Sequence, residues 1–194
     1  MKPITFALIA SIGFATTACS KPAATPDSPA VSSTANSSYD LVASTGRGFT
    51  VGTLMSAQTA YVFFDPQCPH CGHLWQAAVP LHNKIRFVWI PIAFNSGKSL
   101  AQSTAILSAK NPMDAMSKHE ELLLAGKGGL AAGTDIPAHI QAELVKTIKS
   151  NTQLLDALGV EAVPYLLAKH KTSKQVVSHS GALTTSALAQ LLGI

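Results

Sequence analysis

The sequence is poor in charged residues, in cysteine and in long hydrophobic runs. Only 12% of its 194 residues are charged, and the formal net charge of +4 at pH 7 is too small and too scattered to indicate nucleic-acid binding. The apolar stretch from Ile4 to Phe14 is shorter than the roughly 20 residues that a transmembrane helix needs. We therefore expect no nucleic-acid partner and no membrane-spanning helix.

Two ligand-binding patterns are also missing. The glycine-rich segment 126–129 lacks the G-x-x-x-x-G-K-[ST] spacing of a phosphate-binding loop. A C-x-x-C pair can be half of a structural zinc site, but no second pair of ligands occurs at a similar spacing. Cys68, His70, Cys71 and His73 are neighbours along a predicted helix, so their side chains point around it and cannot converge tetrahedrally. We predict no metal and no organic cofactor.

The start of the chain predicts export. A basic residue, an apolar stretch and small residues up to Ala18 are typical of a signal peptide, here residues 1–18. Three cysteines are an odd number for an exported protein, and Thr16 to Cys19 resemble a bacterial lipoprotein cleavage box, which would place lipid on Cys19. Ordinary cleavage that leaves Cys19 as a free thiol is the alternative. Ser20 in place of aspartate resembles the outer-membrane sorting pattern, so we expect a periplasmic protein with a lipid anchor in that membrane.

The remaining chain divides into two parts. Residues 19–38 are mostly Pro, Ala, Ser and Thr and predict a flexible tether, because they cannot bury a core. Residues 39–194 are enough for one well-buried domain and few for two.

A cysteine pair directly follows the apolar run Tyr61 to Phe64, which predicts a buried strand. Pro69 suits the first position of a helix, where its missing N–H has no intrahelical partner, and this makes Cys68 the N-cap. There the free amides and the positive end of the helix dipole favour a thiolate, so the pKa of Cys68 should fall from about 8.5 to between roughly 3.5 and 7.5. Cys71 lies one turn on, at a spacing that permits a disulfide. We predict a redox site with Cys68 as nucleophile and Cys71 as the more buried, resolving cysteine.

The order of the predicted elements indicates an α/β, thioredoxin-like fold. Pro80 should kink or end the first helix. Hydrophobic periodicity predicts, in order, a strand at 60–64, a helix at 68–82, a strand at 85–93, helices at 101–110 and 113–124, helical spacing over 140–158 with a break near Asn151, strands at 165–169 and 175–179, and a helix at 184–192. The arrangement is βαβ, a helical insertion, then ββα.

Residues 62–71 resemble the active-site segment of the DsbC/DsbG family of periplasmic disulfide isomerases, and the DsbG catalytic domain in particular. Segments 72–78, 105–112 and 158–164 are similar to further DsbG segments in the same order. The resemblance implies thiol–disulfide exchange at Cys68 and Cys71, with cysteines of exported proteins as substrates and an unidentified membrane redox partner. It also implies that Pro164 is a cis proline facing the cysteines and that the backbone of Val163 binds a substrate strand.

The chain departs from the family in three ways. The family has an N-terminal dimerisation domain where this sequence has the tether, so we expect a monomer. Val163 stands where threonine is usual, and both this valine and the Cys-Pro-His-Cys quartet with Pro69 and His70 resemble the oxidase DsbA. His70 should stabilise the Cys68 thiolate and make the disulfide more oxidising.

Several alternatives stay open at this point. The same sulfur chemistry serves an oxidase, an isomerase or a reductase. A rival from another class is a lipoprotein that carries copper or zinc on its cysteine and histidine residues without catalysis. Thioredoxins also often bury an acid six positions before the first cysteine as a proton acceptor, and here that position holds Val62.

Overall fold

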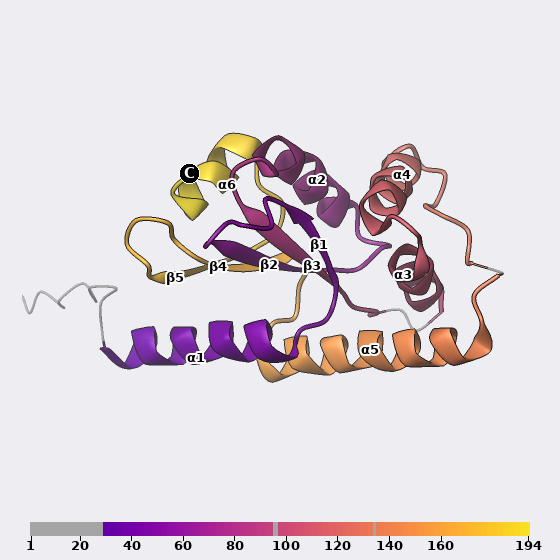
Figure 1. The fold of residues 1–194 in the computed structure, drawn as a ribbon, viewed down its shortest axis with the longest axis horizontal. Helices are drawn as coiled ribbons and strands as arrows, with labels where there is room; N and C mark the ends of the chain where they lie inside the picture. The colour runs from indigo at the N-terminus through magenta and orange to yellow at the C-terminus, as the bar shows by residue number, and fades with distance from the viewer. Residues whose placement is uncertain (1–28, 95–96, 134) are drawn as a thin grey trace, which may run out of the picture.

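A five-stranded mixed sheet forms the centre of the molecule (Figure 1). The computed structural model describes residues 29–94, 97–133 and 135–194. Within the sheet β2 and β3 are parallel, and the other neighbouring pairs are antiparallel. In the spatial order β1-β3-β2-β4-β5, the strands are Phe49–Gly52, Arg86–Pro91, Thr59–Phe64, Tyr165–Lys169 and Val176–Ser180.

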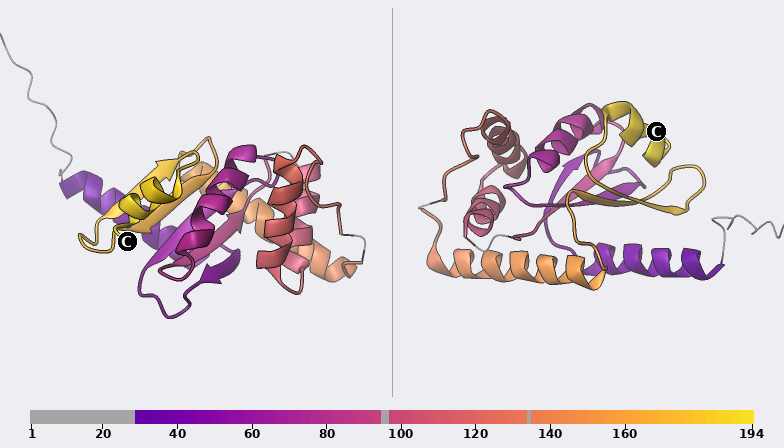
Figure 2. Two further views of the ribbon diagram at one scale, coloured as in Figure 1. Left: turned by 90° about the horizontal axis from the view of Figure 1, so that it is seen from above. Right: turned by 180° about the vertical axis from the view of Figure 1, so that it is seen from behind.

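Helices cover both faces of the sheet. Helices α2 and α6 lie on one face, α1 and α5 run end to end along the other, and α3 and α4 flank the sheet beside α2 (Figures 1 and 2). The helices are α1 Pro29–Thr45, α2 Pro69–Ala78, α3 Lys98–Ser108, α4 Pro112–Leu124, α5 Ala138–Ala157 and α6 Thr185–Leu192, with a short 3₁₀ turn, η1 Val79–Leu81, after α2. Among the described helices, none combines the length and the apolar character needed to cross a membrane.

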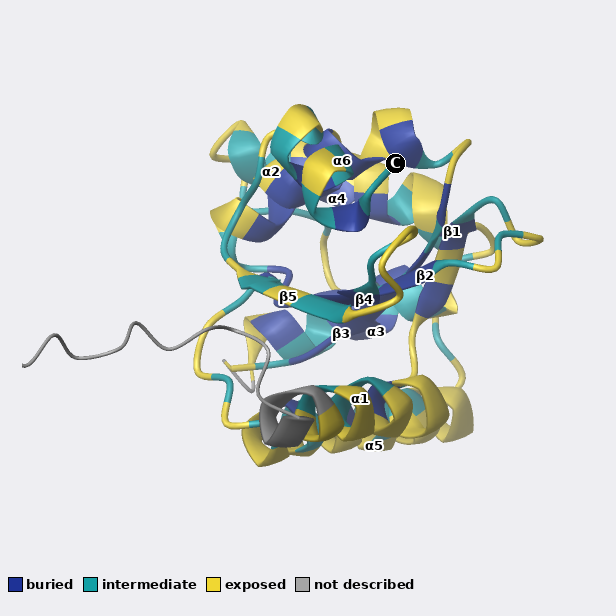
Figure 3. Ribbon diagram, turned by 90° about the vertical axis from the view of Figure 1, so that its left-hand side faces the viewer, coloured by how far each residue is buried: buried dark blue, intermediate teal, exposed yellow. Residues whose placement is uncertain are grey.

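The central strands are buried on both sides, which explains why they form continuous apolar runs (Figure 3). Val62 and Phe64 of β2 pack with Trp89 of β3 beneath α2 and α6. Phe63 and Ile90, which point the opposite way, pack beneath α1 and α5. Successive side chains of a strand point to opposite faces of the sheet, which explains why Val62 and Phe64 lie on one face and Phe63 on the other. Because both faces are covered, β2 is held firmly, and so is the start of the loop that follows Phe64.

The predicted thioredoxin-like order is confirmed, with small shifts of the element ends. Pro80 does end the first helix, because α2 stops at Ala78 and the chain passes into η1. The sequence analysis missed β1, a four-residue edge strand that pairs with β3. It also gave no helix before the sheet, whereas α1 begins at Pro29, inside the predicted tether.

Tertiary contacts explain the helix α1. Val42 is fully buried, the hydroxyl of Tyr39 donates to the carbonyl oxygen of Thr59 at 3.3 Å, and the rings of Tyr39 and Tyr61 stack edge to face at 5.4 Å. A mostly polar segment can therefore stay helical when two or three side chains anchor it to a sheet. The predicted signal peptide, residues 1–18, and Cys19 lie outside the described residues.

The predicted break near Asn151 is wrong, because α5 is continuous from Ala138 to Ala157. The buried side chain of Asn151 donates to the carbonyl oxygens of Arg47 at 2.7 Å and Pro91 at 2.9 Å, and it accepts from the Arg47 amide at 3.1 Å. An asparagine that would compete with the helix in water instead satisfies backbone groups of the sheet and its loop.

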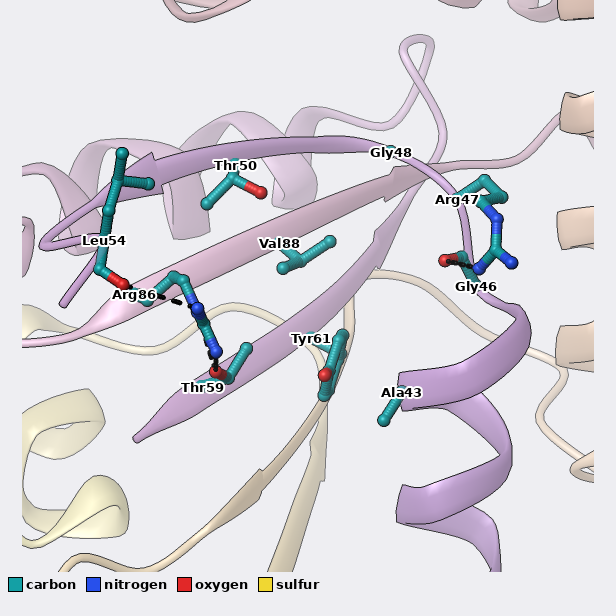
Figure 4. A pocket seen from close by; sticks show the side chains of 10 residues that line it. All are labelled: Ala43, Gly46, Arg47, Gly48, Thr50, Leu54, Thr59, Tyr61, Arg86 and Val88. Atoms are coloured by element: carbon teal, nitrogen blue, oxygen red, sulfur yellow. Dashed lines mark hydrogen bonds between the residues drawn. The ribbon is translucent and has the colours of Figure 1, made fainter. Parts of the chain in front are cut away.

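A hollow of about 370 Å³ opens on the α1 face of the sheet (Figure 4). Arg86 lines it and donates to the Thr59 hydroxyl at 2.6 Å and 2.9 Å, while Arg47 donates to the Gly46 carbonyl at 3.0 Å. Of the predicted site residues that the structure describes, none lines this hollow. Any chemistry of the cysteine pair belongs to the other end of β2.

Candidate active site

The site is built on the turn between β2 and α2. Cys68 is the N-cap of α2 in an extended conformation, with Pro69 as the first helical residue. The amide of Cys68 donates to the carbonyl of Asp65 at 3.0 Å, and the amide of Cys71 donates to the carbonyl of Cys68 at 3.0 Å. These placements agree with the sequence prediction.

The carboxylate of Asp65 holds this turn against the insertion. It accepts hydrogen bonds from the Gln67 amide at 2.7 Å, the Ser99 hydroxyl at 2.7 Å and the Phe94 amide at 2.9 Å. A buried carboxylate with three donors is well satisfied. The loop therefore presents the first cysteine from a rigid support.

The two cysteines have opposite environments. Cys68 is half-buried, and a hydrogen bond from the Cys71 thiol, which outweighs the opposing effect of burial, lowers the pKa of Cys68 to about 6. The backbone N–H groups of Cys71 and His70 and the charge of His70 lower this pKa further, although the sulfur forms no capping hydrogen bond of regular geometry. Cys71 is fully buried, and burial followed by the neighbouring Cys68 raises its pKa well above the ordinary value. At neutral pH the pair is thus a thiolate beside a thiol.

His70 and Pro69 are both exposed on the first turn. The ring of His70 lies 6.4 Å from that of His73. The influence of His70 on the Cys68 pKa is smaller than that of Cys71, which ranks it as a secondary tuning group.

The resemblance correctly implied a cis peptide bond between Val163 and Pro164. The carbonyl oxygen of Val163 lies 3.4 Å from the sulfur of Cys68 and accepts a hydrogen bond from it when Cys68 is protonated. A hollow of about 340 Å³ opens beside this contact. Its walls include the half-exposed ring of Phe94 together with Ala162, Val163, Cys68, Ser99, Gln67 and Asp65.

The sequence analysis missed Glu120 on α4. This glutamate is 1% exposed, its carboxylate lies against Gly72 of α2, and within the described part of the chain neither carboxylate oxygen has a hydrogen-bond partner. Burial, and secondarily the charge of Cys68, raise the pKa of Glu120 to about 8. The spacing Met116, Glu120, Leu124 was an available signal, because it places an acid on the buried stripe of a helix.

The neighbouring His119 fixes the position of α4. Its Nδ1 accepts from the Leu130 amide at 3.1 Å, so Nε2 carries the proton and donates to the Pro66 carbonyl at 2.7 Å. Burial lowers the pKa of His119, which favours this neutral form. The insertion is therefore tied directly to the residues that precede Cys68.

The metal alternative gains no support from the geometry. In residues 29–94, 97–133 and 135–194, no group of three or more His, Cys, Asp or Glu side chains is placed to hold a metal ion. His70 and His73 both lie on the exposed side of α2, away from the buried Cys71.

The fold and the cysteine pair define a class: thioredoxin-fold proteins with a C-x-x-C site at the start of the helix after the central strand. No family model matches the sequence. A periplasmic thioredoxin-like protein from Salmonella enterica serovar Typhimurium superimposes with a TM-score of 0.62 at 17% identity, over 81% of this chain and 95% of its own. The thiol-disulfide exchange protein α-DsbA2 from Wolbachia pipientis gives a TM-score of 0.58 at 18% identity, over 85% and 95%. These similarities establish the fold.

Within this class the chain is similar in sequence to two DsbG proteins. It is 32% identical to the thiol:disulfide interchange protein DsbG of Pseudomonas aeruginosa over 148 residues, which are 73% of this chain and 54% of that protein. It is 32% identical to the DsbG of Escherichia coli over 121 residues, which are 60% of this chain and 46% of that protein. The chain thus spans about half the length of these curated relatives.

Proposed function

We propose that this protein is a thiol–disulfide oxidoreductase that acts on cysteines of exported proteins through Cys68 and Cys71. One observation carries the proposal: a half-buried Cys68 whose pKa is lowered to about 6 stands beside a fully buried Cys71 thiol. A thiolate is the nucleophile in disulfide exchange, and a buried second thiol can release the adduct. The similarity to DsbG supports the same reaction.

Oxidation of a substrate would proceed in two exchanges. A substrate thiolate attacks the Cys68 sulfur of the oxidised pair, so that the Cys68–Cys71 bond breaks and a mixed disulfide forms. A second substrate thiolate then displaces Cys68 as the leaving group. The low pKa of Cys68 favours its departure, because a sulfur of lower pKa leaves faster. Reduction or isomerisation starts instead with attack by the Cys68 thiolate.

The loop before β4 would bind the substrate backbone. The Val163 carbonyl oxygen lies 3.4 Å from the Cys68 sulfur, which places the Val163 backbone beside the position of any mixed disulfide. An extended substrate segment can add its own hydrogen bonds to such an edge. The adjacent hollow, with Phe94 and Ala162 in its walls, suits an apolar side chain near the substrate cysteine.

The direction that we favour is oxidation. Stabilising the Cys68 thiolate makes the reduced enzyme more stable and its disulfide more oxidising. The hydrogen bond from Cys71 and the secondary influence of His70 both act in that sense. An isomerase or a reductase would use the same side chains, and the reduction potential of the Cys68–Cys71 pair is the property that would differ.

The remaining parts of the proposal concern location and partners. We propose a periplasmic protein with lipid on Cys19 that anchors it to the outer membrane, a membrane redox partner that restores the active form, and a monomeric state. Support comes from the leader-like start of the sequence and from the lipoprotein-like residues around Cys19. Mass spectrometry of the processed N-terminus and light scattering test the lipid and the monomer.

The reduction potential tests the central proposal. The purified chain carrying Cys19→Ser, which removes the third thiol, is equilibrated in graded glutathione buffers and the Cys68 and Cys71 thiols are trapped by alkylation. A potential near the roughly −120 mV of DsbA supports an oxidase, and one near the roughly −270 mV of thioredoxin supports a reductase. Cys68→Ser and Cys71→Ser should each abolish the two-thiol transition. A chain that never forms the Cys68–Cys71 disulfide would overturn the proposal.

A further inference from the structure

Cys71 lies where water does not reach it, yet it must lose a proton whenever the reduced pair closes to the disulfide, either when the protein is re-oxidised or when it reduces a substrate. The side chain is 0% exposed and its pKa is raised. To close the disulfide and release a partner sulfur held on Cys68, the sulfur of Cys71 must attack as a thiolate. Some group inside the protein must therefore accept its proton.

The surroundings of Cys71 contain few candidates for that acceptor. Cys68 and Glu120 are the titratable side chains that influence the pKa of Cys71, and Asp65 acts on it only through its backbone N–H. In the mixed disulfide Cys68 is bonded to the substrate and has no charge with which to take a proton. Glu120 is the acid that remains.

Glu120 itself has no other assigned partner. Its carboxylate lies against Gly72, the residue that follows Cys71, and a side chain at position 72 would overlap with its Oε2 atom. Both carboxylate oxygens are buried without a hydrogen-bond partner in the part of the chain that the structure describes. A buried polar group without partners is costly, and where one occurs in a native structure it calls for a catalytic or solvent-mediated explanation.

We propose that Glu120 is the buried proton acceptor for Cys71, so that the helical insertion completes a reaction centre otherwise formed by α2. This inference rests on the proposed function and adds a residue to the same site. The position that holds the proton-accepting acid in many thioredoxins is Val62 here, whereas Glu120 comes from α4 and its carboxylate lies against Gly72, the residue after Cys71.

The step balances as follows. The S–H bond of Cys71 breaks and the proton passes to the Glu120 carboxylate, directly or through one water. The electron pair left on the Cys71 sulfur forms the Cys68–Cys71 bond. The bond between Cys68 and the substrate sulfur breaks, and its electron pair leaves with the substrate. The cysteine pair is oxidised, the substrate is reduced, and Glu120 later returns the proton to solvent or to the leaving thiolate.

The charge environment makes the pKa of Glu120 suitable for this role. A pKa of about 8 leaves a fraction ionised at neutral pH and gives a conjugate acid strong enough to return the proton. Apart from burial, Cys68 is the group that shifts this pKa. Helix α4 packs against α2, α3 and β1. Strand β1 carries no titratable or charged side chain. The other such side chains on these elements are His70, Cys71 and His73 on α2, Lys98 on α3, and Asp114, Lys118, His119 and Glu121 on α4.

A single-turnover experiment separates the two chemical steps. The reduced Cys19→Ser chain is mixed with glutathione disulfide, quenched with acid at successive times and analysed by intact mass, which resolves the Cys68–glutathione adduct from the final disulfide. The rate of adduct formation reports attack by Cys68, and the rate of adduct decay reports resolution by Cys71. Both are measured between pH 5.5 and pH 9.5.

In the unmodified site we expect the rate of resolution to rise with pH and then level off, with an apparent pKa at or somewhat below 8. The value can lie below 8 because Cys68 is uncharged in the adduct and no longer raises the pKa of Glu120. Glu120→Gln should slow resolution at pH 7 by about a hundredfold or more and remove the plateau, while adduct formation stays nearly unchanged. Glu120→Asp, which keeps the acid, should restore part of the rate. Glu121→Gln is the matched control, because this exposed neighbour pairs with Lys118 at the surface.

The outcomes are distinguishable. Unchanged resolution and an unchanged pH profile in Glu120→Gln would overturn the inference, and so would an equal slowing of both steps, which indicates a purely structural role. Circular dichroism and the thermal midpoint verify that each variant is folded. If the unmodified chain forms no glutathione adduct at Cys68, the proposed function itself fails and the inference fails with it.

Discussion

The sulfur of Cys68 lies 3.4 Å from the carbonyl oxygen of Val163, 95 residues later in the sequence, and donates a hydrogen bond to it when protonated. The same sulfur accepts a hydrogen bond from Cys71, the strongest single influence on its pKa. One cysteine thus joins the start of α2 to the loop before β4. The thiol that lowers the pKa of Cys68 and the loop that we propose to bind a substrate backbone both contact this atom.

The Cys71 thiol sets the acidity of Cys68. Replacing Cys71 with alanine removes the hydrogen bond, so we expect the pKa of Cys68 to rise from about 6 towards the ordinary value of a cysteine. Cys71→Ser keeps a donor and should leave the pKa closer to about 6. The thiolate absorbance near 240 nm, followed against pH in the Cys19→Ser background, measures both values. A pKa that stays near 6 in both variants would show that the helix start, and not Cys71, controls ionisation.

The buried carboxyl of Glu120 should make the fold less stable at neutral pH. The pKa of Glu120 is about 8 in the folded protein and near 4.5 when the side chain is exposed. Between these two pH values the unfolded chain releases a proton that the folded chain retains. The free energy of unfolding therefore falls as the pH rises through this range. Glu120→Gln should therefore unfold like the unmodified chain at pH 4.5 but be more stable at pH 7 by up to about 3 kcal/mol. Urea unfolding of the oxidised protein at both pH values measures the difference, with Glu121→Gln as control. A loss of stability at pH 7 would contradict the assigned burial of the carboxyl.

Asn151 joins α5 to the end of β3 and to the loop before β1. Asn151→Ala removes its three hydrogen bonds and leaves the Arg47 amide and the carbonyls of Arg47 and Pro91 without that partner. We expect a loss of about 2–4 kcal/mol in the free energy of unfolding, since buried polar groups left unsatisfied cost about 1–3 kcal/mol each and partial hydration recovers some of it. The neighbouring exposed Ser150→Ala should change stability little. A loss below about 0.5 kcal/mol for Asn151→Ala, within the range of ordinary surface substitutions, would mean that these bonds are exchanged for water at no cost.

Most of the fold was predictable because its signals are local. The apolar run before Cys68 and the helical spacing that follows report burial on a strand and on a helix face, and each depends on residues within one element. The elements that were missed or broken depend on distant partners. The helix α1 is held by Tyr39 and Val42 against the sheet, and α5 passes through Asn151 because that side chain bonds to residues 60 and 104 positions earlier.

By itself the sequence determined that a cysteine pair begins a helix after a buried strand, since Pro69, the spacing of Cys68 and Cys71 and the preceding apolar run act over a few residues. Only the tertiary structure decided which groups surround that pair. It placed the Val163 carbonyl on the sulfur of Cys68, and it brought Glu120, from a helix some 50 positions further on, against Gly72. A side chain's pKa depends on burial and on charges close in space, and neither is fixed until the chain has folded.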